Sequence, residues 1–233
     1  MIPFGEWLPD QAPLNSSGAT VATNVIAAAR GYRPFLGLAN LSQAADAYLR
    51  GFFATIDSGG TVHLFAGNAT KLFKFNAATA ALDDVKSGAY TLASDDQWQF
   101  VQFGNSVYAA SGLNNLLQKY TLGSSSTFAD VSGSPKAKFL AVIRDFVVTA
   151  HNNTSSTNNP FRVQWSQIND ADTWTVGSNQ ADFQDIPDAG NITGLVGGDF
   201  GVVLLERGIA RMQYVGSPLI FTFDMVETGH GCD

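Results

Sequence analysis

The sequence has almost no cysteine. Its 233 residues contain one, Cys232. A single thiol cannot close an internal disulfide and cannot build a thiolate zinc site, so disulfide frameworks and zinc modules of that kind are excluded. This usage is typical of a protein that matures in a reducing compartment.

Charge is also scarce, and basic charge most of all. Charged residues make up 14% of the chain, and 13 Lys and Arg stand against 20 Asp and Glu, a formal net charge of −7. This balance argues against sequence-independent binding to DNA or to an anionic membrane, because both need clustered basic residues. A surface of the same sign as nucleic acid suits a wall past which DNA moves, and equally an ordinary soluble protein.

Long hydrophobic runs are missing as well, and we expect no secretory leader. No stretch approaches 18 apolar residues, so we expect no membrane span. The segment 1–6 lacks both the basic region and the apolar region of a secretory signal. The high share of hydrophobic residues, 45%, argues against intrinsic disorder.

The sequence contains no strong catalytic spacing. His63, His151 and His230 are far apart and none belongs to a zinc-binding pair. No Gly-x-Ser-x-Gly elbow and no phosphate-binding Gly-Lys-Ser/Thr loop occurs. We expect His63 to be a structural residue within a strand and His151 to be solvated at the start of a polar loop. No enzyme activity, cofactor or metal is predicted.

Two acidic loops allow a weaker alternative. Asn169–Trp174 carries alternate oxygen side chains that suit a hard cation such as calcium, but a turn capped by Asx side chains is the simpler interpretation. Asp182, Asp185 and Asp188 surround Pro187, and we expect them to be solvated. Ser166–Trp174 also resembles a sialidase Asp-box, with one extra residue and no glycine.

Gly, Asn, Ser, Thr and Phe are abundant, which favours an all-β protein over a helical bundle. From about Tyr48 a unit repeats: an apolar run, a tight turn rich in Gly, Asn or Asp, and a second apolar run. The expected hairpins are 51–56 with 62–65, 98–103 with 107–110, 139–143 with 146–149, and 192–196 with 202–205. Third strands are expected at 72–75, 117–120, 163–165 and 212–214, and fourth strands at 84–88, 130–133, 173–176 and 221–224.

Four-stranded units of this length predict β-propeller blades. The equivalent positions Val62, Val107, Phe146 and Val202 are separated by 45, 39 and 56 residues, and the last step contains a polar insertion at 151–160 and a loop at 177–190. Such a meander has two apolar faces, each of which needs a neighbouring blade to cover it. A β-sandwich or a set of separate hairpins remains open. Phenylalanines in the strand runs are expected to be core residues; they are Phe52, Phe53, Phe73, Phe75, Phe100 and Phe103.

The flanking regions differ from the repeats. Residues 1–47 are interrupted by four prolines and predict an extended N-terminal arm, within which the run 21–29 is either a short helix or a strand. The blades are expected over 48–226, at about 48–90, 97–133, 137–177 and 191–226. Residues 227–233 form a polar tail or a truncated continuation.

Several segments spread over nearly the whole chain together resemble the nozzle, or tail hub, proteins of short-tailed bacteriophages. The segments are Leu8–Asp10, Asn24–Ile26, Gly31–Leu38, Val142–Val148, Val163–Ser166, Asn169–Trp174, Asp185–Asp188, Ile192–Gly198 and Leu205–Ile209. The resemblance implies a propeller-containing structural subunit of the virion tail. It implies assembly as a homohexamer beneath the head-to-tail adaptor ring, around the channel through which the genome leaves.

That resemblance sets the expected partners and location. The expected partners are further copies of the chain, the adaptor, other tail proteins such as fibres or spikes, and double-stranded DNA passing without specific binding. The subunit would assemble in the host cytoplasm and reside in the virion. In such an assembly the arm would lie on a neighbour, with Trp7, Tyr32, Arg33 and Phe35 as interface residues. A carbohydrate-binding propeller and a sialidase-like hydrolase are the alternative functions.

Overall fold

A computed structural model describes residues 14, 18, 21, 23–28, 31–35, 37, 39–154 and 157–231 of the chain. The chain divides into two compact units, residues 1–41 and 42–233. All regular structure in the described residues is β-strand, arranged in five antiparallel sheets. The expected all-β, propeller-like array of four-stranded antiparallel blades is confirmed.

The first unit contains one two-stranded sheet. Strand β1 (Val25–Ala28) pairs with β2 (Gly31–Pro34), and Val25 lies opposite Pro34. Residues 25–28, within the run that the sequence left open between helix and strand, therefore form a strand.

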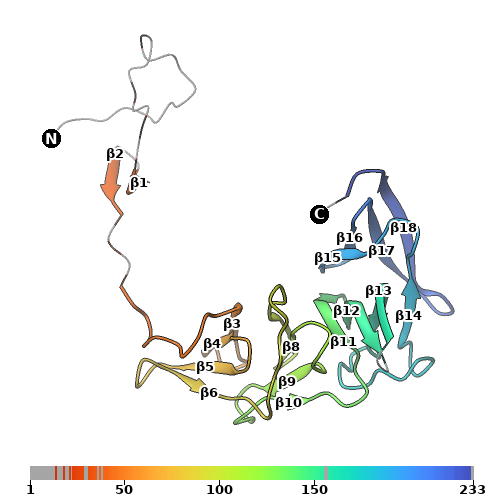
Figure 1. The fold of residues 1–233 in the computed structure, drawn as a ribbon, viewed down its shortest axis with the longest axis horizontal. Helices are drawn as coiled ribbons and strands as arrows, with labels where there is room; N and C mark the ends of the chain where they lie inside the picture. Colours follow the sequence, from red (N-terminus) through yellow and green to blue (C-terminus); the bar gives the residue numbers. More distant parts are fainter. Residues whose placement is uncertain are drawn as a thin grey trace. The chain divides into compact units, whose positions relative to one another are not determined.

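The second unit contains four sheets, each built from four consecutive strands (Figure 1). The strands of the first sheet are β3 (Gly51–Ile56), β4 (Val62–Gly67), β5 (Leu72–Asn76) and β6 (Ala81–Asp84). Those of the second sheet are β7 (Gln99–Phe103), β8 (Ser106–Ala110), β9 (Gln118–Thr121) and β10 (Ala129–Asp130).

The third and fourth sheets are larger because their hairpins are longer. The strands of the third sheet are β11 (Lys136–Ile143), β12 (Phe146–Thr154), β13 (Thr157–Trp165) and β14 (Asp182–Asp185). Those of the fourth sheet are β15 (Ile192–Val196), β16 (Gly201–Leu205), β17 (Gly208–Gly216) and β18 (Ile220–Thr228).

Each sheet packs face to face on the next one in sequence. The first strands of consecutive sheets meet, β3 with β7, β7 with β11 and β11 with β15, so the first strand of every sheet is the innermost one. Three hydrophobic clusters fill the interfaces between sheets one and two, two and three, and three and four. No such cluster in the described part of the chain joins the fourth sheet to the first, so the array is an open arc (Figure 1).

Three of the four fourth-strand predictions are wrong. The fourth strand of the third sheet is β14, not residues 173–176, and β6 and β10 end at Asp84 and Asp130, the residues at which the predicted strands began. Trp174 mimics a strand residue because it is apolar and buried, but it lies in a loop, where its indole nitrogen donates to the carbonyl of Ala171 at 3.0 Å. Burial of a loop residue produces the same local pattern as a strand.

The polar run at 151–160 does not form the loop that the sequence predicts. β12 and β13 continue through this region as one long hairpin, with Asn152 opposite Asn159 and Thr154 opposite Thr157. A bulge separates Ala150 from Asn152, and His151 at that bulge has a φ of 53°. Polar residues form a strand here because hydrogen bonds between the two strands pair their backbone N–H and C=O groups, regardless of the side chain.

Candidate functional site

The residues expected at a subunit interface lie in or next to β2, apart from Trp7, which is outside the described residues. Tyr32 is half-buried opposite Ala27, and Arg33 is exposed opposite Ile26. Phe35 follows the strand and its amide donates to the carbonyl of Asn24 at 2.8 Å, while half of its surface is exposed. The hairpin thus brings three of the four residues together.

The histidines have structural surroundings. His63 lies in β4, and its Nε2 is 2.9 Å from the Asp57 carboxylate, which also accepts the amides of Gly59 and Thr61. These hydrogen bonds, that from His63 first, lower the pKa of Asp57. No group of three or more potential metal ligands is found among the described residues.

His151 is not solvated, contrary to expectation. Its Nδ1 lies 3.2 Å from the carbonyl oxygen of Ile192, and its ring lies beside that of Phe139. Burial between the third and fourth sheets lowers the pKa of this imidazole. The bulge places the side chain there, and nothing in the local sequence signals it.

The two acidic loops serve the fold. Asp170 accepts hydrogen bonds from the amide of Asp172 and the hydroxyl of Thr173, which confirms an Asx-capped turn. Asp185 is not a free solvated carboxylate, because Arg162 donates to both of its oxygens at 2.7 and 2.8 Å. That ion pair holds β14 against β13.

The free face of the first sheet is the first of two apolar surfaces left uncovered. We use this name for the side of β3 and β4 that points away from the second sheet. Phe52 is 62% exposed there, and Ile56 and Val62 are exposed to a similar extent. The prediction that Phe52 is a core residue is therefore wrong, although Phe73 from the same sheet is buried.

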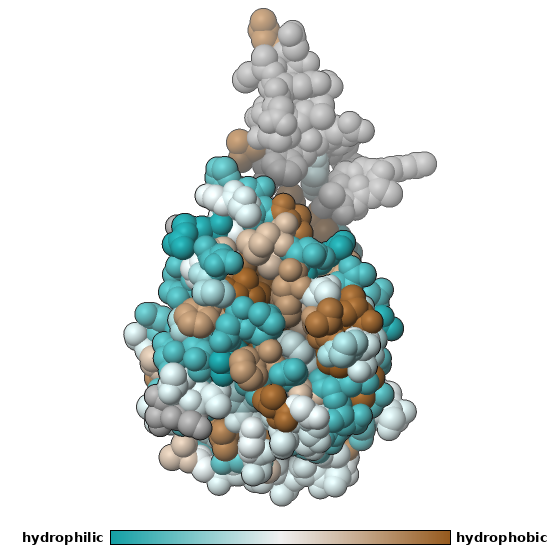
Figure 2. All heavy atoms as spheres, turned by 90° about the vertical axis from the view of Figure 1, so that its right-hand side faces the viewer, coloured by the Kyte–Doolittle hydropathy of each residue, from teal (hydrophilic) through white to brown (hydrophobic). Residues whose placement is uncertain are grey.

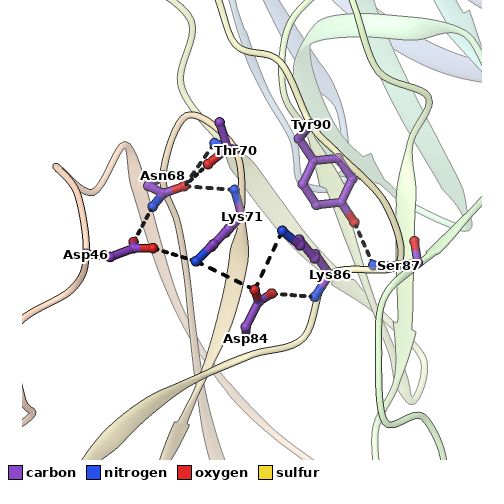
Figure 3. A network of polar contacts seen from close by, with 8 residues as sticks. All are labelled: Asp46, Asn68, Thr70, Lys71, Asp84, Lys86, Ser87 and Tyr90. Carbon is purple, nitrogen blue, oxygen red and sulfur yellow. Dashed lines mark hydrogen bonds and ion pairs between the residues drawn. The ribbon is translucent and has the colours of Figure 1, made fainter.

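Part of that sheet is covered by the segment that precedes β3. Asp46 accepts hydrogen bonds from the Asn68 amide and from Lys71, both in the β4–β5 turn (Figure 3). The hydrogen bond from Lys71 lowers the pKa of Asp46, and the same contact raises that of Lys71. Asn68 is 1% exposed and its side-chain oxygen accepts the amides of Thr70 and Lys71, so its side chain is fully used within the fold.

The free face of the fourth sheet is the second uncovered surface. It is the side of β15, β16 and β17 that points away from the third sheet, and it carries Val196, Val202, Leu204 and Val215. Val196 is 54% exposed and Val215 is also half exposed. Figure 2 views the molecule from the side of the fourth sheet and shows hydrophobic patches among hydrophilic side chains.

A polar pocket lies where the innermost strands begin. Its cavity has a volume of about 240 Å³ and is lined by Asp95, Asp96, Gln97, Gln99, Gly112, Lys138 and Phe139. The Lys138 ammonium is 3.5 Å from the carboxylate of Asp96, which is only 7% exposed. Gly112 has a φ of 84°, and a Cβ at this position would overlap that carboxylate, so the close approach requires glycine.

A second hollow adjoins this pocket and shares Asp95, Asp96 and Gln97 with it. Its other lining residues come from 48–51 and Ser94, and Tyr48 among them is 85% exposed. Arg50 donates to the carbonyl of Ala93 at 2.5 Å, which ties β3 to the loop before β7. Sequence reasoning missed the pocket and the adjoining hollow because their residues together come from three sheets and form no local motif.

Comparisons with known proteins support the fold. No protein-family model and no curated protein matches the sequence. A solved structure with similar architecture is the extracellular domain of the putative hybrid two-component system BT4673 from B. thetaiotaomicron, with a TM-score of 0.52 and 13% identity over 81% of this chain. The match spans 23% of that chain, and similarity at this level of identity concerns the fold alone.

A second solved structure is that of BBS1N in complex with ARL6DN, soaked with lead. The match covers 82% of this chain and 58% of that chain. The identity is 14% and the TM-score is 0.41, which is too low to bear on the fold. Within the described residues no helix is long and apolar enough to cross a membrane.

Proposed function

We propose that this chain is a structural subunit of a short-tailed bacteriophage tail, part of the nozzle beneath the head-to-tail adaptor ring. The observation that carries the proposal is the open array of sheets, which leaves an apolar face at each end. An exposed apolar face of this kind is typical of a surface that contacts further protein. The family resemblance supplies the kind of assembly.

The net charge agrees with a conduit for DNA. At −7 the chain repels phosphates over its surface, so double-stranded DNA would pass without being retained. The hairpin with Tyr32, Arg33 and Phe35 is the proposed contact with a neighbouring subunit or the adaptor. The proposal includes the family's other expectations, which are contacts with other tail proteins, a location in the virion and assembly in the host cytoplasm. It requires no catalysis.

The test is co-assembly with the adaptor ring of the same phage, followed by electron microscopy. We expect the purified chain to add a ring of density beneath the adaptor, and a chain lacking residues 1–38 to lose that binding. A mobility-shift assay should detect no complex with duplex DNA at low salt. Failure of the intact chain to bind the adaptor under any condition would refute the tail function.

Binding of a neutral sugar is the alternative, and the pocket around Asp96 is the observation that favours it. Carboxylates and amides of Asp95, Asp96, Gln97 and Gln99 offer hydrogen-bond partners to hydroxyl groups. The exposed ring of Tyr48 in the adjoining hollow offers a surface on which a pyranose ring stacks.

A glycan array tests this alternative. We expect a sugar-binding chain to lose its signal when Tyr48 is replaced by Ala or Asp96 by Asn. The matched control is Asp199→Asn, a change at an exposed aspartate outside the pocket. Turnover of a fluorogenic sialoside by the same protein would instead indicate a sialidase-like hydrolase.

A further inference from the structure

We propose that a pocket between the first and second sheets binds a small hydroxylated monocarboxylate, such as a sugar acid, through Lys74 and Tyr120. The cavity has a volume of about 440 Å³, which lies within the range of small-molecule sites. It shares no residue with the pocket around Asp96. The inference does not rest on the tail function, because the pocket needs neither an assembly nor the adaptor.

The packing of the first two sheets fixes the position of one hydrogen-bond donor of the pocket. Lys74 of β5 lies opposite Phe65 of β4, so both side chains are on the face that meets the second sheet. The ring of Phe65 lies edge-on to that of Tyr120 in β9, with ring centroids 5.1 Å apart. Tyr120 also packs against Phe128 and is only 3% exposed. These contacts hold the Tyr120 hydroxyl group in place before a ligand arrives.

The ammonium group of Lys74 has no carboxylate partner within the part of the chain that the structure describes. It donates to the Tyr120 hydroxyl at 3.2 Å and lies 5.1 Å from the centre of that ring. Asp83 is opposite Lys74 in β6, but its carboxylate accepts a hydrogen bond from the Asn76 side chain at 2.9 Å instead. Other lysines of the described chain do pair with an aspartate; they are Lys71, Lys86, Lys119 and Lys138.

Two donors therefore lie side by side with protons left for a ligand. An ammonium group has three N–H bonds, and that of Lys74 uses one of them on Tyr120. The Tyr120 hydroxyl accepts this bond, and its own proton has no acceptor among the described residues. Because the two donor atoms are 3.2 Å apart, the oxygens of one carboxylate can accept from both. A carboxylate is favoured over a phosphate, because a single ammonium group balances one negative charge and Asp83 lines the same pocket.

The rest of the lining suits hydroxyl groups. Nε2 of His63 is 2.9 Å from the Asp57 carboxylate, so this nitrogen carries the proton and Nδ1 is left as an acceptor. Thr61 and Ser126 line the same cavity, and neither hydroxyl group has a hydrogen-bond partner in the described part of the chain. These groups offer partners to the hydroxyl groups of a ligand whose carboxylate is bound by Lys74.

The test is an NMR titration of the backbone amides near neutral pH. The probe is glucuronate, and glucose is the neutral comparison, with a hydroxymethyl group in place of the carboxylate. We expect saturable shifts with glucuronate and binding of glucose that is weaker by about tenfold or more, because hydrogen bonds to an ionised group are stronger than those between neutral groups. Cyclohexanecarboxylate, which keeps the carboxylate and the ring size but lacks the hydroxyl groups, should also bind more weakly than glucuronate.

Two variants test the two donors. Lys74→Met removes the charge and keeps a long side chain, whereas Tyr120→Phe removes only the hydroxyl group and keeps the ring against Phe65 and Phe128. Each should weaken the binding of glucuronate by about tenfold and change that of glucose little. Lys136→Met is the matched control, because it removes the same charge from β11, outside the pocket, and it should leave the affinity unchanged. The amide spectrum of each variant checks that the fold is retained.

Four results would overturn the inference. They are the absence of saturable shifts at any concentration of glucuronate, equal affinities for glucuronate and glucose, a folded variant of Lys74 or Tyr120 that binds glucuronate as tightly as the wild type, and shifts around Asp96 in place of shifts at 61–63 and 74–76. An equal loss with Lys136→Met would show attraction by net charge alone, and equal binding of cyclohexanecarboxylate would contradict recognition of hydroxyl groups. Adaptor binding is measured separately, so failure of this site leaves the tail function undecided and the reverse also holds.

Discussion

At the scale of single residues, Trp98 shows how one side chain joins two sheets. Its indole nitrogen donates to the carbonyl oxygen of Asn68 at 2.8 Å, and its ring packs edge-on against Tyr90 at 5.1 Å. The ring lies directly over Gly67, the last residue of β4. A residue with a side chain at position 67 would therefore displace the ring and disturb the interface between the first two sheets.

We predict that Gly67→Ala destabilises the protein by about 1–3 kcal/mol, the usual cost of overpacking a filled core. The Cβ would overlap Cδ1 and Nε1 of Trp98. The measurement is the free energy of unfolding in urea. Gly88→Ala is the control, because nothing lies within 4 Å of a Cβ at that position. Equal stabilities of the two variants would contradict this account of the interface.

His151 predicts a pH dependence of stability. Burial lowers the pKa of its imidazole below the value near 6.5 of the unfolded chain, so the folded state binds the proton more weakly. This contribution to stability is complete above pH 6.5 and is lost as the pH falls toward the folded-state pKa. Lys138, Asp96 and Glu206 are the charged groups that influence it.

The test compares the wild type with His151→Gln between pH 7.5 and 5. We expect the wild type to lose more unfolding free energy than the variant, with a difference in slope below about 1.4 kcal/mol per pH unit, the limit for one proton. Parallel pH profiles of the two proteins would show that His151 titrates alike in the folded and unfolded states.

At the scale of elements, the third sheet depends on a side-chain contact at its outer edge. β14 is a short strand after a long loop, and Arg162 of β13 holds it through both oxygens of Asp185. The same guanidinium lies 3.8 Å from the ring centre of Phe183. The edge strand is thus attached by an ion pair and a cation–π contact in addition to the backbone ladder.

We predict a coupling free energy of about 0.5–1 kcal/mol between Arg162 and Asp185, since both side chains remain partly accessible to solvent. The measurement is a double-mutant cycle of thermal stability with Arg162→Met, Asp185→Asn and the double variant. Salt should weaken the coupling. A coupling of zero would mean that the ladder alone holds β14.

At the scale of the whole molecule, the four four-stranded sheets differ in how many of their faces are covered by a neighbouring sheet. The second and third sheets pack on both faces, whereas the first and fourth each pack on one and expose the other. In an array where each sheet contacts only its neighbours, stability is a sum of sheet and interface contributions. The end sheets should therefore open more readily than the middle ones.

Hydrogen exchange of the chain tests this prediction. The strands compared are the second strands, β8 and β12 against β4 and β16, because each is hydrogen-bonded on both sides within its own sheet. We expect about tenfold or greater protection of the middle strands, equivalent to about 1.4 kcal/mol. Uniform protection across the four sheets would indicate a single cooperative unit instead.

Local patterns in the sequence predicted much of the array. Apolar runs around turns rich in Gly, Asn or Asp located the first hairpin of every four-stranded sheet, because strand alternation and turn residues act over a few residues. The fourth strands were harder. Trp174 resembled a strand residue although it lies in a loop, and the polar run 151–160 resembled a loop although most of it belongs to β12 and β13.

The sequence by itself determined the all-β class, the fourfold repeat and the acidic balance, since these depend on composition and short-range order. Only the tertiary structure decided which apolar residues are covered. Phe52 and Phe100 are each the second residue of the first strand of their sheet, yet one is exposed and the other packed. The pocket around Asp96 likewise depends on the second and third sheets meeting. Burial and convergence are set by contacts between residues distant in the chain, which no local pattern encodes.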